Sequence, residues 1–143
     1  MAANTTPIYS KAGQISFSAL LQTANIAKDG TGVTSLIFTA GADGARVERV
    51  RIKPVGTNVA TVVRIFINNG SNPTVAANNV LYAEKTIAAN TLSESAESAL
   101  NELPNITDTT AFPLVLPPSY RLYATIGTTV AAGIRITAIG STY

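Results

Sequence analysis

The amino-acid sequence predicts an all-β protein folded as an antiparallel β-sandwich, and three observations support this fold class. Short runs of β-branched and apolar residues alternate with polar residues, which is the period of a strand. Clusters of Gly, Asn, Asp and Pro separate these runs at regular intervals, as they do in sandwiches and barrels. No long segment has apolar residues at sustained helical spacing.

The chain divides into an arm and one domain. Residues 1–13 are polar, contain Pro7 and Gly13, and show no sustained period. We interpret them as an N-terminal arm, a type of segment that is either disordered alone or docked on a neighbour. The chain has 143 residues, a common size for a single domain. We therefore expect residues 14–143 to form one jelly-roll-like β-sandwich.

Strands and turns follow one another along this domain. The first two predicted strands cover residues 15–21 and 33–40. Asp29-Gly30-Thr31-Gly32 lies between them and Gly41-Ala42-Asp43-Gly44 follows the second, and both sequences are typical of turns. Later strands are predicted at residues 49–53, 59–67, 80–87, 121–127 and 133–139.

Segment 59–67 shows the alternation clearly. A period of two divides it into two faces, the first formed by Val63, Ile65 and Ile67 and the second by Val62, Arg64 and Phe66. The sequence Asn68 to Pro73 then ends the strand, because Asn-Gly and Pro do not fit together into a central strand.

The segment near 92–103 leaves two alternatives open. Its apolar residues follow helical spacing, at Leu92, Ala96, Ala99, Leu100 and Leu103. Thr91 and Glu94 match a capping box, and Pro104 would end a helix. An extended, Ser-rich crossover between strands would use the same residues. The sequence thus predicts either one short helix near 92–103 or such a crossover.

Composition excludes several classes of protein. The chain has no Cys and no His, which excludes a disulfide framework and a Cys/His zinc site. A net charge of +2 without a dense basic patch is unlike a nucleic-acid binder. No apolar run approaches the roughly 20 residues of a membrane-spanning helix. The N-terminus lacks the basic and apolar regions of a secretory signal. We expect a protein made in a cytoplasm, without nucleic-acid or membrane partners.

No group of residues is suited to catalysis. The usual acid–base residue, His, is absent, and Asp29 and Asp43 precede Gly, where Asp stabilises turns. Neither a Gly-x-Ser-x-Gly nor a Gly-Lys-Ser/Thr motif occurs. We predict that the chain is not an enzyme and uses no metal, cofactor or small-molecule substrate. A hydrolase that relies on carboxylates alone, such as Glu94, Glu97 and Glu102, is a distant alternative.

Strand 49–53 is the candidate partner-docking segment. Val50 and Ile52 point to one face, while the opposite face carries Arg49, Arg51 and Lys53. One interpretation is that these cations dock on an acidic surface of a partner subunit. The other is a solvated strand face whose cations pair with Glu48 or Glu84 across the sheet, and this second interpretation is favoured.

Two stretches resemble a known family. The first lies in residues 28–70 and includes Lys28-Asp29-Gly30-Thr31-Gly32, Phe38-Thr39-Ala40-Gly41-Ala42-Asp43-Gly44, Gly56-Thr57-Asn58-Val59-Ala60-Thr61 and Arg64-Ile65-Phe66-Ile67-Asn68-Asn69-Gly70. The second runs from Leu116-Pro117-Pro118-Ser119-Tyr120 through Ile126-Gly127-Thr128-Thr129-Val130-Ala131-Ala132-Gly133. Together they resemble short virion structural proteins of tailed bacteriophages, of the capsid decoration (cement) type.

This resemblance implies a structural role and no catalytic residue or cofactor. A decoration protein stabilises the capsid exterior by binding the major capsid protein, and such proteins often assemble as homo-oligomers, commonly trimers. The expected location is the exterior of a virion assembled in a bacterial cytoplasm. Multivalent attachment would make modest contacts effectively permanent. The alternative is a tail, baseplate or fibre component with a receptor- or glycan-binding role, for which Tyr120 and Tyr123 are candidate contacts.

Overall fold

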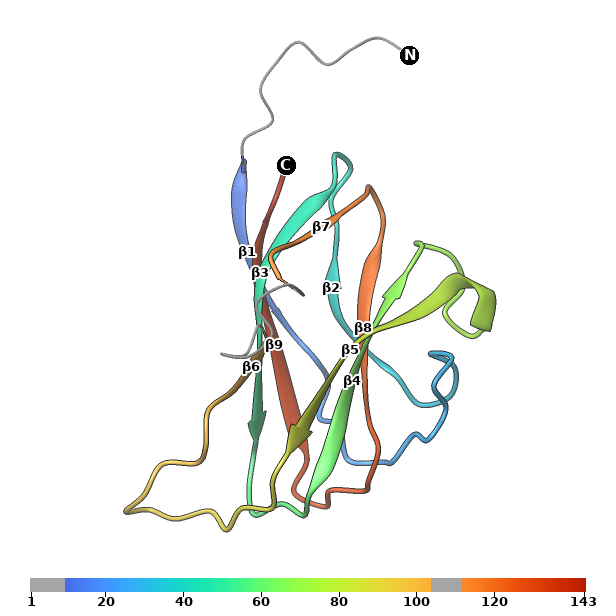
Figure 1. Ribbon diagram of the computed structural model, residues 1–143. Coiled ribbons are helices and arrows are strands. Elements are labelled where there is room, and N and C mark those ends of the chain that lie inside the picture. Colours follow the sequence, from blue (N-terminus) through green and yellow to red (C-terminus); the bar gives the residue numbers. More distant parts are fainter. Residues whose placement is uncertain (1–9, 104–111) are drawn as a thin grey trace, which may run out of the picture.

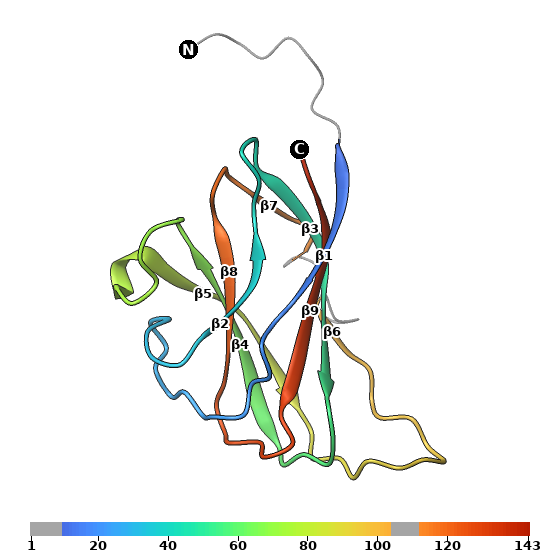
Figure 2. The same ribbon diagram turned by 180° about the vertical axis from the view of Figure 1, so that it is seen from behind.

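The computed structural model describes residues 10–103 and 112–143, which form two antiparallel β-sheets packed as a sandwich (Figure 1; Figure 2). The strands are, in chain order, β1 (Ala12–Phe17), β2 (Ser35–Thr39), β3 (Ala45–Pro54), β4 (Thr61–Asn68), β5 (Asn79–Ile87), β6 (Asn101–Leu103), β7 (Leu114–Leu116), β8 (Arg121–Ile126) and β9 (Ile134–Thr142). The described residues also contain one 3-10 turn, η1 (Ala76–Asn78), and no α-helix. No helix in them is long and apolar enough to cross a membrane. The predicted all-β fold is confirmed.

The strands pair as nested antiparallel ribbons. β1 pairs with β9, β2 with β8, β3 with β6 and β7, and β4 with β5. Pairing of β9 with β3 completes sheet A, in the order β1-β9-β3-β6. β7 pairs with the first part of β3, on the same side as β6. Pairing of β8 with β4 completes sheet B, in the order β2-β8-β4-β5. This nesting of the first strands with the last is the jelly-roll topology, as expected.

The core lies between the inner faces of the two sheets. Val50 and Ile52 are completely buried, as their alternation with the cations of β3 predicted. In β4, Val63 and Ile65 belong to the core and Ile67 packs against it, again as predicted. Other large core residues come from strands of both sheets, including Ile37, Phe38, Val47, Ile87, Leu116, Leu122, Ile126, Ile134 and Ile136.

Phe66 is buried on the other side of sheet B. It shares the outer face of β4 with Arg64 and is fully inaccessible, yet it lies outside the core cluster. The β1–β2 and β4–β5 connections lie over this outer face (Figure 1). Buried Asn68 organises the second connection, because its side chain donates to Asn79 Oδ1 at 2.8 Å and accepts from the Gly70 N–H at 2.9 Å.

In β1 the polar side chains point into the sandwich and the apolar side chains point outward, which is the reverse of the other strands. Ser16 and Gln14 point toward β2, where their side chains donate to the carbonyl oxygens of Ile37 at 2.5 Å and Thr39 at 3.5 Å. These polar side chains satisfy acceptors at the edge of sheet B. The apolar residues of the same strand therefore face outward, which the description of 15–21 as an apolar stretch did not anticipate.

The start of β1 lies within the predicted arm. The strand begins at Ala12, which pairs with Thr142, so the last residues of segment 1–13 belong to sheet A. Residues 1–9 of that segment lie outside the described residues.

The segment near 92–103 is the extended crossover and not the short helix. Residues 91–100 contain no helix, and β6 follows them. Leu103 is buried, but Leu92 and Leu100 are exposed, so a helix here would have had no core to pack against. A short helix without such packing is marginal in water. The crossover instead extends away from the sandwich (Figure 1).

Gly140 of β9 lies against an irregular part of β3. The register between the two strands shifts between Val47 and Arg49, which leaves Glu48 as an extra residue in β3. A β-bulge of this kind bends the strand locally. A Cβ on Gly140 would meet the backbone carbonyl of Arg46 and would lie 2.9 Å from Val47 Cα. Only glycine allows this close approach of the two backbones.

We expect Gly140→Ala to lower the free energy of unfolding by about 3 kcal/mol, because backbone atoms cannot move aside as side chains do. Urea unfolding measures the loss. Gly13→Ala on β1 is the matched control, since a Cβ there meets no atom within 4 Å, and it should change stability by less than about 0.5 kcal/mol. Equal stability of the two variants would contradict the observed register of β3 and β9.

Candidate docking face

The outer face of sheet A brings the three predicted cations together with apolar side chains of β1 and β9. β3 lies in the middle of the sheet, between β9 and the pair β6 and β7. The residues that define this docking face are Ile15, Phe17, Arg49, Arg51, Lys53, Arg135, Thr137 and Ile139.

Strand register arranges the docking face in rows that run from apolar to cationic. The pairings of β1 with β9 and of β9 with β3 define two such rows, Phe17–Thr137–Arg51 and Ile15–Ile139–Arg49. Ile15 is 69% exposed and Phe17 is 65% exposed, which is unusual for large apolar residues in a strand. An exposed apolar patch bordered by charge is typical of a protein–protein interface.

The cations of β3 differ in their partners. Arg51 forms an ion pair with Glu102 of β6 at 2.5 Å, and Lys53 Nζ donates to Ser98 Oγ at 2.8 Å. These two residues connect β3 to the end of the crossover. Within residues 10–103 and 112–143, the side chain of Arg49 makes no hydrogen bond or ion pair, so its guanidinium is available to a partner.

The acids expected to pair with these cations bind other residues. Glu48 pairs with Arg46 at 2.5 Å, and Glu84 pairs with Arg64 in sheet B at 2.8 Å. Five of the chain's ten Lys and Arg residues lie on the outer face of sheet A, namely Arg46, Arg49, Arg51, Lys53 and Arg135. Among residues 10–103 and 112–143, the acids of that face are Glu48 and Glu102, so the described part of the face has a net positive charge.

Arg135 and Phe17 belong to the face but were not identified from the sequence. The Arg135 guanidinium lies 5.8 Å from the centre of the Phe17 ring, within range of a cation–π interaction, and donates to the Ser18 carbonyl at 3.0 Å. The alternation of segment 133–139 does place Arg135 outward. Only the pairing of β1, β9 and β3, which is remote in sequence, places it beside the cations of β3.

Asp29 and Asp43, which lie outside the docking face, bind neighbouring side chains. Asp29 accepts from the hydroxyl and backbone N–H of Thr31 at 2.7 and 3.0 Å, and these hydrogen bonds lower the pKa of Asp29. Asp43 pairs with Lys11 at 2.9 Å. In the part of the chain that the structure describes, no group of three or more Asp and Glu side chains could hold a metal ion.

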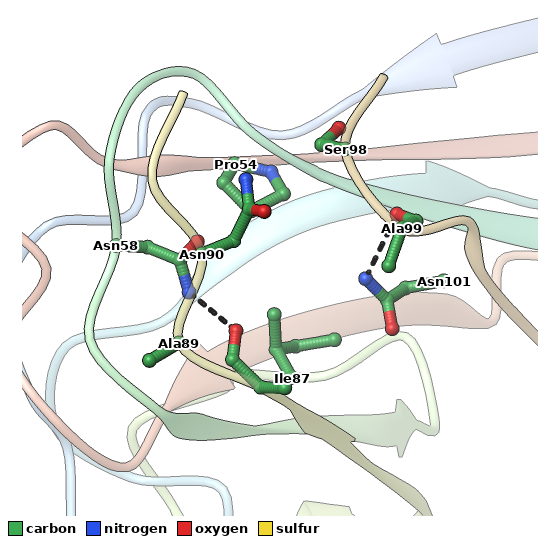
Figure 3. A pocket seen from close by; sticks show the side chains of 9 residues that line it. Pro54, Asn58, Ile87, Ala89, Asn90, Ser98, Ala99 and Asn101 are labelled. Carbon is green, nitrogen blue, oxygen red and sulfur yellow. Dashed lines mark hydrogen bonds between the residues drawn. The ribbon is translucent and has the colours of Figure 1, made fainter. Parts of the chain in front are cut away.

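A small cavity lies where the crossover meets the β3–β4 loop (Figure 3). Its volume is about 80 Å³, and its lining includes Pro54, Ile87 and Asn101. Asn58 also lines it, donates to the Ala88 carbonyl at 2.9 Å, and has a buried Oδ1 without a hydrogen-bond partner in the described structure. A space of this size suits a few water molecules rather than a substrate.

No protein-family model, curated protein or solved structure matches this chain.

Arg49 is expected to be dispensable for folding. Arg49→Ala should change the free energy of unfolding by less than about 0.5 kcal/mol, because Arg49 is exposed. Ile52→Ala, on the buried face of the same strand, should cost about 3 kcal/mol. Chemical denaturation of both variants measures the difference. A loss above about 1.5 kcal/mol for Arg49→Ala would show that Arg49 serves the fold.

Proposed function

We propose that this chain is a non-enzymatic structural subunit of a virion, which decorates and stabilises a bacteriophage capsid by binding the major capsid protein. The observation that carries the proposal is the docking face, where exposed Ile15 and Phe17 of β1 share one sheet face with the unpaired cation Arg49, across β9. The resemblance to decoration proteins supplies the class of partner.

The chemistry of the docking face suggests how it binds. Covering Phe17 and Ile15 would supply the affinity, since full burial of one such side chain contributes about 1.5–3 kcal/mol. The neighbouring cations favour a partner surface that combines apolar and acidic residues, and they orient the subunit during encounter. Repetition of the contact over a capsid lattice then makes attachment long-lived.

The fold and composition support a role in assembly. Jelly rolls occur in viral capsid proteins and also in lectins, so the topology alone does not select a function. Only 13% of the residues are charged, against roughly 25% in an average soluble domain. A surface poor in charge offers little resistance to association. We propose a location on the capsid exterior and a homo-oligomeric state, with a trimer as the expected form.

The structure offers less support for a receptor- or glycan-binding role. Tyr120 packs against the hydrophobic core, and Tyr123 lies opposite Phe66 on β4. Both tyrosines are half-buried. A sugar or nucleotide platform normally uses aromatic rings that are open on one face.

Replacement of Arg49 by Glu tests the proposed contact. We expect Arg49→Glu to weaken binding to capsids that lack the protein by at least about tenfold, because it places a carboxylate against an acidic surface. Binding of the unchanged protein should also weaken as ionic strength rises. Cosedimentation with capsids measures both effects.

Lys28→Glu is the control for this measurement, because it makes the same change of charge at an exposed residue outside the docking face. It should change the affinity by less than about twofold. Equal binding by the Arg49→Glu variant and the unchanged protein would exclude the docking face as the capsid contact.

A further inference from the structure

One end of the sandwich is formed by segments without charged residues. The charged side chains that reach it come from neighbouring strands: Arg64 lies beside Gly127, and Arg135 donates to the Ser18 carbonyl. Three connections form it: residues 55–60 between β3 and β4, residues 127–133 between β8 and β9, and residues 88–92 at the start of the crossover (Figure 1). None of them contains Asp, Glu, Lys or Arg. Residues 18–24 adjoin them and are equally free of charge. We call these four segments the uncharged end.

Hydrogen bonds join these connections into one surface. Asn58 and Asn90 exchange two backbone hydrogen bonds, at 2.9 and 3.1 Å. The Leu92 N–H donates to the Thr57 hydroxyl at 3.1 Å, and the Val55 N–H donates to the Gly133 carbonyl at 3.0 Å. Residues 18–24 are held by the Val130 N–H, which donates to the Gln22 carbonyl at 3.0 Å. A surface that is already ordered loses little conformational entropy when it binds.

Apolar side chains are exposed on this end. Val55 and Val59 are each 53% exposed, and Leu92 is 47% exposed. The centres of protein–protein interfaces are depleted in charge and enriched in apolar area in the same way. The four segments contain no Tyr, Phe or Trp, so the end lacks the rings that stack on sugars or bases.

We propose that the uncharged end binds the same end of a second copy of this chain, so that the ends meet around a shared symmetry axis. The docking face is unsuitable for such contact, because two copies of a net positive face repel each other. The segments of the uncharged end contain no charged residue that would repel a second copy. An acidic capsid surface, by contrast, would lose the hydration of its carboxylates here and gain no cation in return.

The two surfaces therefore have different partners. The docking face fits an acidic protein of another kind, and the uncharged end fits this chain itself. The inference deepens the proposed function, because it names the surface through which copies associate, and it can be tested on the purified protein without capsids. Whether two or three copies meet follows from the mass of the assembly.

Charge placed at Val59 tests this contact. Val59 is half exposed, so Val59→Glu and Val59→Lys leave the isolated subunit folded, which thermal unfolding checks. In sedimentation experiments the unchanged protein should associate, and each variant alone should associate at least about tenfold more weakly. An equimolar mixture of the two variants should regain association, because opposite charges then face each other.

Val80→Glu is the matched control. Val80 is 57% exposed and lies on β5 at the strand end remote from the uncharged end, so this variant should associate like the unchanged protein. A monomeric unchanged protein, full association of Val59→Glu, or no recovery in the mixture would each overturn the inference. Capsid binding that still depends on Arg49 in that case would leave the proposed function standing.

Discussion

The pairing of β3 with β9 is the contact on which the rest of the structure depends. It joins two nested ribbons into sheet A and places the register shift at Glu48 against Gly140. A slip of one residue would turn the cations of β3 into the core, because neighbouring residues in a strand point to opposite faces. The same pairing continues through β9 to β1 and so sets Phe17 in line with Arg51.

Much of this fold could be predicted from the sequence, because alternation is a local property. It identified the core residues of β3 and β4 and the outward direction of Arg49. The reversed pattern of β1 was not predictable, since Ser16 and Gln14 satisfy carbonyl groups of a strand distant in sequence. The position of Arg135 on the docking face was not predictable either, because it depends on the pairing of β9 with β1 and β3, which are distant in sequence. The sequence could not decide between a helix and an extended crossover near 92–103, because the spacing of apolar residues does not show whether Leu92 packs against the core.

In β1 the inward-pointing polar side chains hold the two sheets together, and the outward-pointing apolar side chains lie on the docking face. The polar side chains of β1 close the gap between the two sheets, so its apolar side chains become available to another molecule. The charged residues are also distributed unevenly. Cations lie on the outer face of sheet A, and residues 55–60 and 127–133 at one end of the sandwich contain no charged residue. A small sandwich can thus present one surface to a foreign partner and another to its own copies.

An electron cryo-microscopy map of the assembled particle tests the central claim most directly. The account predicts density for this subunit on the capsid exterior, with the outer face of sheet A against the major capsid protein and Phe17 covered. A map that places the subunit in the tail, or that leaves Phe17 and Arg49 facing solvent on the capsid, would contradict it.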